Sequence, residues 1–345
     1  MVQQGLLFFF KYKNMKKVKE TVGIDVSKLT LDVHLHKAGL HQQFGNDLSG
    51  FKKILAWVKS KELKSDDVLF CFEHTGWYCV LLGYFLHEKG IDYCCVNPTE
   101  IKRSMGLKRG KSDKADAKEI AYYAWLRRED LKPSQPPAAN LIELQRMMSM
   151  REQFVKQAVA LKNLRCGMEQ LTGKKSHDFS ILAITETIEH LESQARKVEK
   201  AMEALIKSDE AMQVNYKLSK SVKGVGLVLA VQMLLHTHNY TRFDSWRQFS
   251  SYCGLVPFPY QSGTSINGRS KIHPIADRKM KSLLSMSAIS AIQHDKELKM
   301  YYTKRVSEGK PKMLVLNIIR NKLVSRIFAT VNRGTPFVEL NQFVA

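Results

Sequence analysis

Four acidic residues are the part of this sequence best suited to chemistry. Asp25 ends the apolar run 21–25, and Glu73 ends a second apolar run, 68–73. Short apolar runs bounded by polar residues predict buried strands, so we expect both carboxylates at strand ends. Asp113 and Asp116 are separated by three positions, a spacing that places them on one face of a helix.

Metal-assisted phosphoryl transfer is the chemistry that such a group of acids predicts. Clustered like charges destabilise a fold unless something neutralises them, and Mg²⁺ prefers carboxylate oxygens as ligands. Two-metal nucleases hold their ions about 4 Å apart, one at the attacking oxygen and one at the leaving oxygen. The sequence therefore predicts a Mg²⁺ site, with Mn²⁺ as the alternative ion, at Asp25, Glu73, Asp113 and Asp116. The competing interpretation is a surface ladder in which the helix acids pair with neighbouring lysines.

The charge balance indicates a nucleic-acid partner. The 345 residues include 54 Lys and Arg against 33 Asp and Glu, a formal net charge of +21. Such an excess attracts polyanions because bound phosphates release their counterions. An anionic membrane surface is the competing partner, but no apolar run approaches the ~20 residues of a spanning helix. The six cysteines form no C-x-x-C pair, which favours reduced thiols in a cytoplasmic protein.

The elements that must position the acids are predicted from periodicity. Residues 20–132 alternate between strand and helix patterns, in the order of an RNase H-like α/β domain. The expected elements are an antiparallel meander over 21–45, helices over 51–59, 77–89 and 114–128, and strands over 68–73 and 91–96. Residues 1–19 are expected to form an N-terminal extension, and Met15 is an alternative start.

Beyond the proline-rich segment 133–137 the pattern becomes helical. Apolar residues spaced by three and four predict two long helices, 138–172 and 178–211, in a coiled-coil arm that spans 138–218. A mostly α domain is expected over 219–345. Its Gly-x-Gly segment at 224–226 fits either a helix-hairpin-helix phosphate loop or an ordinary glycine-rich turn that caps a core helix.

Two further features of this second domain concern charge and metal binding. Basic runs near 278–281 and 304–312 favour phosphate contact, because their charges are nearly uniform in sign. His236 and His238 are expected to be ordinary surface residues, since two histidines without a third ligand make a poor metal site.

Six short motifs resemble those of one protein family. Residues 22–28, 72–76 and 111–117 are similar to the RuvC-like DEDD domain of bacterial insertion-sequence transposases, the bridge-RNA-guided recombinases. Residues 224–226, 249–257 and 261–263 resemble the second domain of that family. The resemblance extends from about residue 20 to residue 330, with the motifs in the family's order.

The resemblance implies more than hydrolysis. In this family the metal site assists a serine that attacks a DNA phosphodiester and forms a covalent phosphoserine, and Ser262 matches that nucleophile. Taken alone, Ser262 is a loop hydroxyl with no local activating group, and Ser265 is the alternative if the register differs. The family also implies a guide RNA that pairs with donor and target DNA, and a homo-oligomer, either dimer or tetramer. The loop 264–267 lacks the basic residues common in relatives, which weakens the expectation of DNA contacts there.

Three rival functions remain open at this point. A Holliday-junction resolvase would use metal-activated water in place of the serine. A non-catalytic RNA-binding protein would make the four acids dispensable. A sugar kinase shares the Gly-Ile-Asp opening, but residues 26–28 lack the glycine of its phosphate loop.

Overall fold

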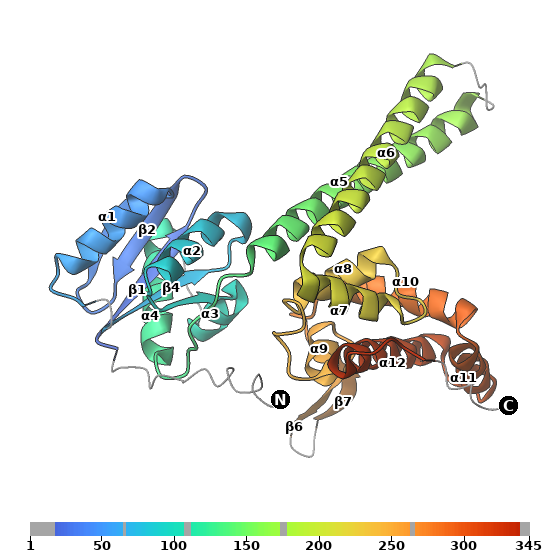
Figure 1. Cartoon of the computed structure of the whole chain (residues 1–345). Helices are drawn as coiled ribbons and strands as arrows, with labels where there is room; N and C mark the ends of the chain where they lie inside the picture. Colours follow the sequence, from blue (N-terminus) through green and yellow to red (C-terminus); the bar gives the residue numbers. More distant parts are fainter. Residues whose placement is uncertain (1–17, 65–66, 107–111, 173–177, 263–265, 339–345) are drawn as a thin grey trace, which may run out of the picture. The chain divides into compact units, whose positions relative to one another are not determined.

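The computed structural model describes residues 18–64, 67–106, 112–172, 178–262 and 266–338. The chain divides into two compact units, Met1–Pro136 and Pro137–Ala345, which run from blue to teal and from green to red in Figure 1. We call them the N-terminal and C-terminal units. Each has its own buried apolar core.

A five-stranded sheet forms the centre of the N-terminal unit (Figure 1). Its strands, in spatial order, are β3 (Leu40–Gly45), β2 (Thr30–Leu35), β1 (Glu20–Val26), β4 (Val68–Glu73) and β5 (Tyr93–Val96). The pairs β1–β2 and β2–β3 are antiparallel, whereas β1–β4 and β4–β5 are parallel. Because β1 and β4 run the same way, their carboxyl ends meet at one edge of the sheet.

Helices cover both faces of this sheet. They are α1 (Leu48–Lys59), η2 (Gly76–Cys79), α2 (Val80–Glu88), α3 (Pro98–Ser104) and α4 (Asp113–Arg127). The apolar sides of α1 and α2 pack on one face of β1 and β4, and α3 and α4 pack on the other. Strand β1 is therefore buried on both faces, which accounts for its nearly continuous apolar sequence.

The predicted elements of this unit largely agree with the structure. The antiparallel meander, the strand at 68–73 and the helix near 114–128 are confirmed. The helix expected over 77–89 is instead a short 3₁₀ turn, η2, followed by α2, and β5 begins at Tyr93 rather than at residue 91. A mixed α/β unit followed by a largely helical one is consistent with an RNase H-like DEDD domain at the N-terminal side.

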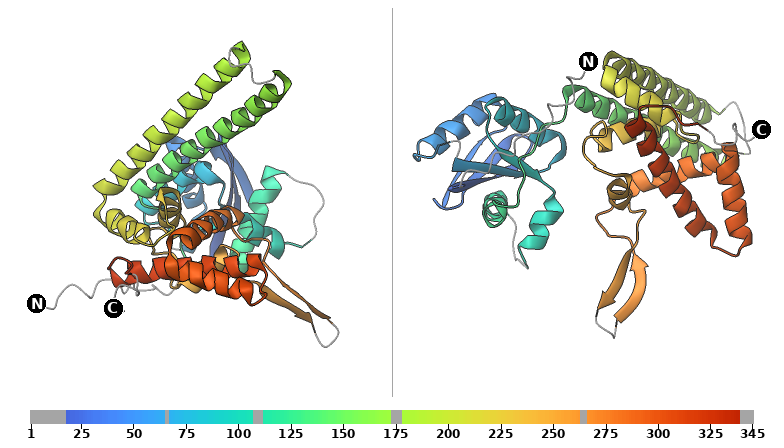
Figure 2. Two further views of the ribbon diagram at one scale, coloured as in Figure 1. Left: turned by 90° about the vertical axis from the view of Figure 1, so that its right-hand side faces the viewer. Right: turned by 60° about the horizontal axis from the view of Figure 1, so that its bottom comes forward.

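The C-terminal unit is helical apart from one hairpin. Its elements are α5 (Ala139–Thr172), α6 (Phe179–Ser208), α7 (Glu210–Lys220), α8 (Leu227–His236), α9 (Trp246–Tyr252), β6 (Phe258–Ser262), β7 (Ile266–Lys271), α10 (Arg278–His294), α11 (Lys296–Ser307) and α12 (Lys312–Arg333). Helices α5 and α6 lie side by side in all views (Figure 2). The second long helix ends earlier than predicted, because Asp209 caps α7 by accepting a hydrogen bond from the Met212 backbone N–H at 3.0 Å.

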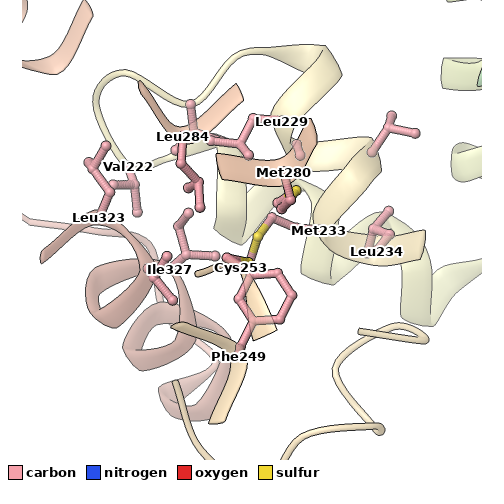
Figure 3. Close-up of a cluster of buried hydrophobic side chains, with 14 of the residues drawn as sticks. Val222, Leu229, Met233, Leu234, Phe249, Cys253, Met280, Leu284, Leu323 and Ile327 are labelled. Carbon is pink, nitrogen blue, oxygen red and sulfur yellow. The ribbon is translucent and has the colours of Figure 1, made fainter. Parts of the chain in front are cut away.

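The core of the C-terminal unit lies between α8, α9, α10 and α12. Met233, Phe249, Met280 and Ile327 contribute to it from one helix each and are fully buried (Figure 3). In the part of the chain that the structure describes, no helix combines the length and the apolar character that crossing a bilayer requires.

The glycine-rich turn between α7 and α8 is built for packing. Gly224 has a φ of +90°, and a Cβ atom there would lie 2.6 Å from the Ser287 backbone oxygen of α10. The valines on both sides of it are buried. The packing of Gly224 fits an ordinary turn, whereas Gly226, which begins α8 without a side-chain cap and has open space around it, also fits a phosphate loop, so both interpretations stay predictions.

Candidate functional site

Direct backbone contact between β1 and α4 brings the acids together. Gly23 of β1 faces α4, and a Cβ atom at this position would lie 2.2 Å from the Ala121 nitrogen and 2.3 Å from the Ala117 oxygen. The Thr21 hydroxyl donates a hydrogen bond to the Ala121 backbone oxygen at 2.8 Å. Only glycine allows this approach, so Gly23 sets the position of α4 against β1, the strand that carries Asp25.

The first turn of α4 presents two of the four acids. Ser112 caps the helix by accepting a hydrogen bond from the Ala115 backbone N–H at 3.3 Å. Asp113 and Asp116 follow in the first turn, where the positive end of the helix dipole favours carboxylates. Asp113 is exposed and Asp116 is half-buried.

Three of the four predicted acids form one cluster. Asp25, Asp113 and Asp116 each offer a carboxylate oxygen, and these oxygens all lie within 4.8 Å of one another. We call this group the acid cluster. Three hard oxygen donors at this spacing, half open to solvent, fit a divalent cation, which the DEDD domain type also suggests.

Glu73 lies beside the acid cluster but outside its closest group. It ends β4 one position after Phe72, which pairs with Ile24 in the parallel register of β1 and β4. The pKa of Asp25 is raised to about 6, first by burial and then by the charges of Asp116, Asp113 and Glu73, in that order. Glu73 is thus close enough to act on Asp25 electrostatically.

Asp32 is a fifth carboxylate that the sequence interpretation missed. It lies opposite Asp25 in the antiparallel pairing of β1 and β2, is buried, and also raises the pKa of Asp25. Its Oδ1 is 2.8 Å from Nε2 of His41, and its Oδ2 accepts a hydrogen bond from Gln43 at 2.9 Å. The polar alternation of 30–35 was the available signal, but only the strand register assigns Asp32 to the face of Asp25.

Ser262 belongs to the C-terminal unit. It is the last residue of β6 and pairs with Ile266 of β7, so it lies at the end of a hairpin strand. Its side chain and the whole of residues 263–265, including Ser265, lie outside the described residues. The acid cluster and the serine therefore come from different units of the chain.

A hydrogen-bonded group holds the two ends of the segment that contains this hairpin. The Asp277 backbone N–H donates to the Tyr252 backbone oxygen at 3.0 Å, and the Tyr252 hydroxyl donates to the Asp277 carboxylate at 3.3 Å. The same hydroxyl is 2.9 Å from Nδ1 of His236. The expectation that His236 is an ordinary surface residue is therefore wrong: it is partly buried and bonded to Tyr252.

Comparisons with known proteins identify two matching regions. Residues 22–168 match a family model for the DEDD transposase domain of IS110, described as "Transposase". Residues 216–303 match a second model, described as "Transposase IS116/IS110/IS902 family". The two regions follow each other in the chain: the first contains all four predicted acids, and the second contains Ser262.

Individual relatives extend the similarity over most of the chain. The pilin gene-inverting proteins of Moraxella bovis and Moraxella lacunata are each 24% identical over 326 residues, which cover 92% of this chain and 98% of the relative. An insertion element IS110 uncharacterized 43.6 kDa protein of Streptomyces coelicolor is 27% identical over 163 residues, 47% of this chain and 39% of that protein.

Proposed function

We propose that this chain, a DNA transposase with two regions that match IS110-family domains, cuts and rejoins DNA with a metal-binding acid cluster and a serine nucleophile. The predicted enzyme class, a DNA transposase, is confirmed, and both matched regions support a transposase of the IS110 family. The observation that carries the mechanistic proposal is the convergence of Asp25, Asp113 and Asp116 within 4.8 Å.

The acid cluster is proposed to hold Mg²⁺, or Mn²⁺ in its place, with Glu73 completing the ligand set. Its donor atoms are carboxylate oxygens, and the pKa of Asp25 is raised by burial first and then by the neighbouring carboxylates, two effects that a bound cation would offset. A bound divalent cation supplies Lewis-acid activation of a phosphate oxygen. Asp32, fixed by His41 and Gln43, adds negative charge behind Asp25 without occupying a ligand position.

Ser262 is proposed to be the nucleophile. Its Oγ loses a proton and forms a bond to a DNA phosphorus, while the bond from that phosphorus to the departing strand oxygen breaks and that oxygen takes up a proton. The number of phosphate ester bonds is unchanged, so a strand hydroxyl can reverse the step and rejoin DNA. The family resemblance and the matched region around Ser262 support this role.

Guide RNA and self-association complete the proposal. The resemblance implies an RNA that pairs with donor and target DNA, and the net charge of +21 suits contact with both nucleic acids. The name of the Moraxella relatives indicates inversion of a gene. Inversion and insertion both need two cuts and two rejoining steps, which favours an assembly of two or four copies.

One observation favours a second candidate function. The acid cluster lies entirely within the N-terminal unit, so it could activate water without the serine. In that case the chain would cut DNA as a resolvase and leave no covalent link.

Trapping of a protein–DNA adduct separates the two candidates. End-labelled DNA that carries the element's ends, incubated with protein, guide RNA and Mg²⁺, should give a covalent adduct on denaturing gels, and peptide mass spectrometry should map it to Ser262. Ser262→Ala should lose adduct and recombination and still bind DNA and RNA, whereas Ser265→Ala is the matched control. An adduct at Ser265 would make Ser265 the nucleophile in place of Ser262. Normal cutting by Ser262→Ala, with no adduct, would support the resolvase function instead.

A further inference from the structure

Helix α12 contains a buried guanidinium without a carboxylate partner. Arg320 is only 4% exposed. Its Nη1 donates a hydrogen bond to the Asn317 side-chain oxygen at 3.3 Å, and its Nε is buried with no hydrogen-bond partner. Among the described residues no carboxylate lies close enough to raise its pKa, which burial alone lowers. A charge held in this way is costly unless an external anion joins it.

A second arginine of the same helix shows the usual solution. Arg326 lies six residues further along α12 and is also partly buried. Its Nη1 is 2.7 Å from the Asp295 carboxylate, and its Nη2 is 2.6 Å from that of Glu297. Among the described residues, the less buried guanidinium thus has two carboxylate partners and the more buried one has none.

A lysine adds positive charge to the same place. Lys281 of α10 is partly buried, and its pKa is lowered first by burial and then by the charge of Arg320. Within the described parts of the chain, no negative group offsets either effect. Two cations that repel each other across the contact between α10 and α12 would both be stabilised by one anion between them.

This place adjoins the segment that leads into the hairpin. The Asn317 side-chain amide donates to the Leu255 backbone oxygen at 2.8 Å, and Leu255 lies three residues before β6 begins. Asn317 therefore contacts both Arg320 and the hairpin segment. Lys281 and Asn317 are each partly exposed, so an anion that approaches the surface of α10 and α12 can contact their side chains.

We propose that Arg320 and Lys281 bind a phosphodiester group of the DNA substrate beside the segment that leads into β6. A planar guanidinium offers paired N–H donors that match two phosphate oxygens, and a neighbouring ammonium adds a point charge. DNA is the assigned ligand because the chain is a DNA transposase. The assignment rests on that activity and does not require Ser262 to be the nucleophile.

The salt dependence of DNA binding tests the assignment. Binding of duplex DNA is measured over a range of salt concentrations for wild type, Arg320→Met and the matched control Arg326→Met. The slope of log affinity against log salt should fall by about one in Arg320→Met and stay at the wild-type value in Arg326→Met. In thermal melts, Arg326→Met should lower the melting temperature more than Arg320→Met does. Arg326→Met leaves the carboxylates of Asp295 and Glu297 without their partner, whereas Arg320→Met removes an uncompensated charge.

Additional variants and a second ligand complete the test. Lys281→Met, at a half-exposed position, carries the same expectation for the slope if Arg320→Met does not fold. Unchanged slopes in both variants would overturn the site and make Arg320 a packing residue. If the variants lowered the salt slope for binding of structured RNA but left the slope for DNA at its wild-type value, the choice of DNA would be overturned. Ser262→Ala should keep the wild-type slope, so a failure of the serine mechanism is distinguishable from a failure of this site.

Discussion

The acid cluster and the pair Arg320–Lys281 are two gatherings of like charge, of opposite sign, and they are built differently. The acids lie near element ends: Asp25 is the next-to-last residue of β1, and two acids lie in the first turn of α4, where the helix dipole favours them. Arg320 lies in the middle of α12 and is nearly inaccessible. The acid cluster is therefore open to a small exchangeable ion, whereas the basic pair is suited to one oriented phosphate group.

Among changes to these two groups of charges, removal of an acid should have the largest effect on activity. Asp25→Asn, Asp113→Asn and Asp116→Asn should each lower strand cleavage by about a thousandfold or more, because several kcal/mol of transition-state stabilisation depend on the bound metal. Glu73→Gln is expected to act in the same direction. Cleavage of labelled DNA in Mg²⁺ measures the loss, and the exposed Asp130→Asn is the control.

Folding and nucleic-acid binding should survive these acid substitutions, because removal of one carboxylate relieves repulsion. Circular dichroism and DNA affinity check this point. Wild-type cleavage by any two of the cluster variants would rule out a metal site at these residues.

The difference between the two regions also explains what the sequence could predict. Asp25 and Glu73 were found because each ends an apolar run, and Asp113 and Asp116 because a three-residue spacing on a helix is visible without coordinates. Gly23, which sets the contact between β1 and α4, carries no such signal, since its role depends on a helix almost a hundred residues away.

Asp32 and Arg320 were missed for a common physical reason. Each is a polar residue in a segment that reads as half-exposed, and its burial follows from which neighbour packs against it. Strand register decides this for Asp32, and the packing of α10 and α9 on α12 decides it for Arg320. Periodicity predicts a face of an element, but it does not predict which faces meet.

A smaller effect is expected from Asp32→Asn. Its charge lies behind Asp25 and strengthens attraction for a cation without being a ligand, so the variant should need about tenfold more Mg²⁺ for half-maximal cleavage. Raised Mg²⁺ should restore the rate, which it should not do for Asp25→Asn. The exposed Asp92→Asn is the control, and a Mg²⁺ requirement equal to wild type would show that Asp32 is only structural.

The smallest effect concerns stability without metal. The raised pKa of Asp25, about 6, means that its charged form is disfavoured in the folded protein at neutral pH relative to the unfolded chain. Asp25→Asn removes that charge at nearly constant shape and should stabilise the chelator-treated protein by on the order of 1 kcal/mol, after allowance for its half-exposed position. In wild type, added Mg²⁺ should raise the melting temperature because it binds the folded state. The same addition should raise the melting temperature of Asp25→Asn much less. Lys281→Met should leave the Mg²⁺-dependent rise intact. Equal rises in wild type and Asp25→Asn would place the stabilising cation elsewhere in the protein and separate the acid cluster from metal binding.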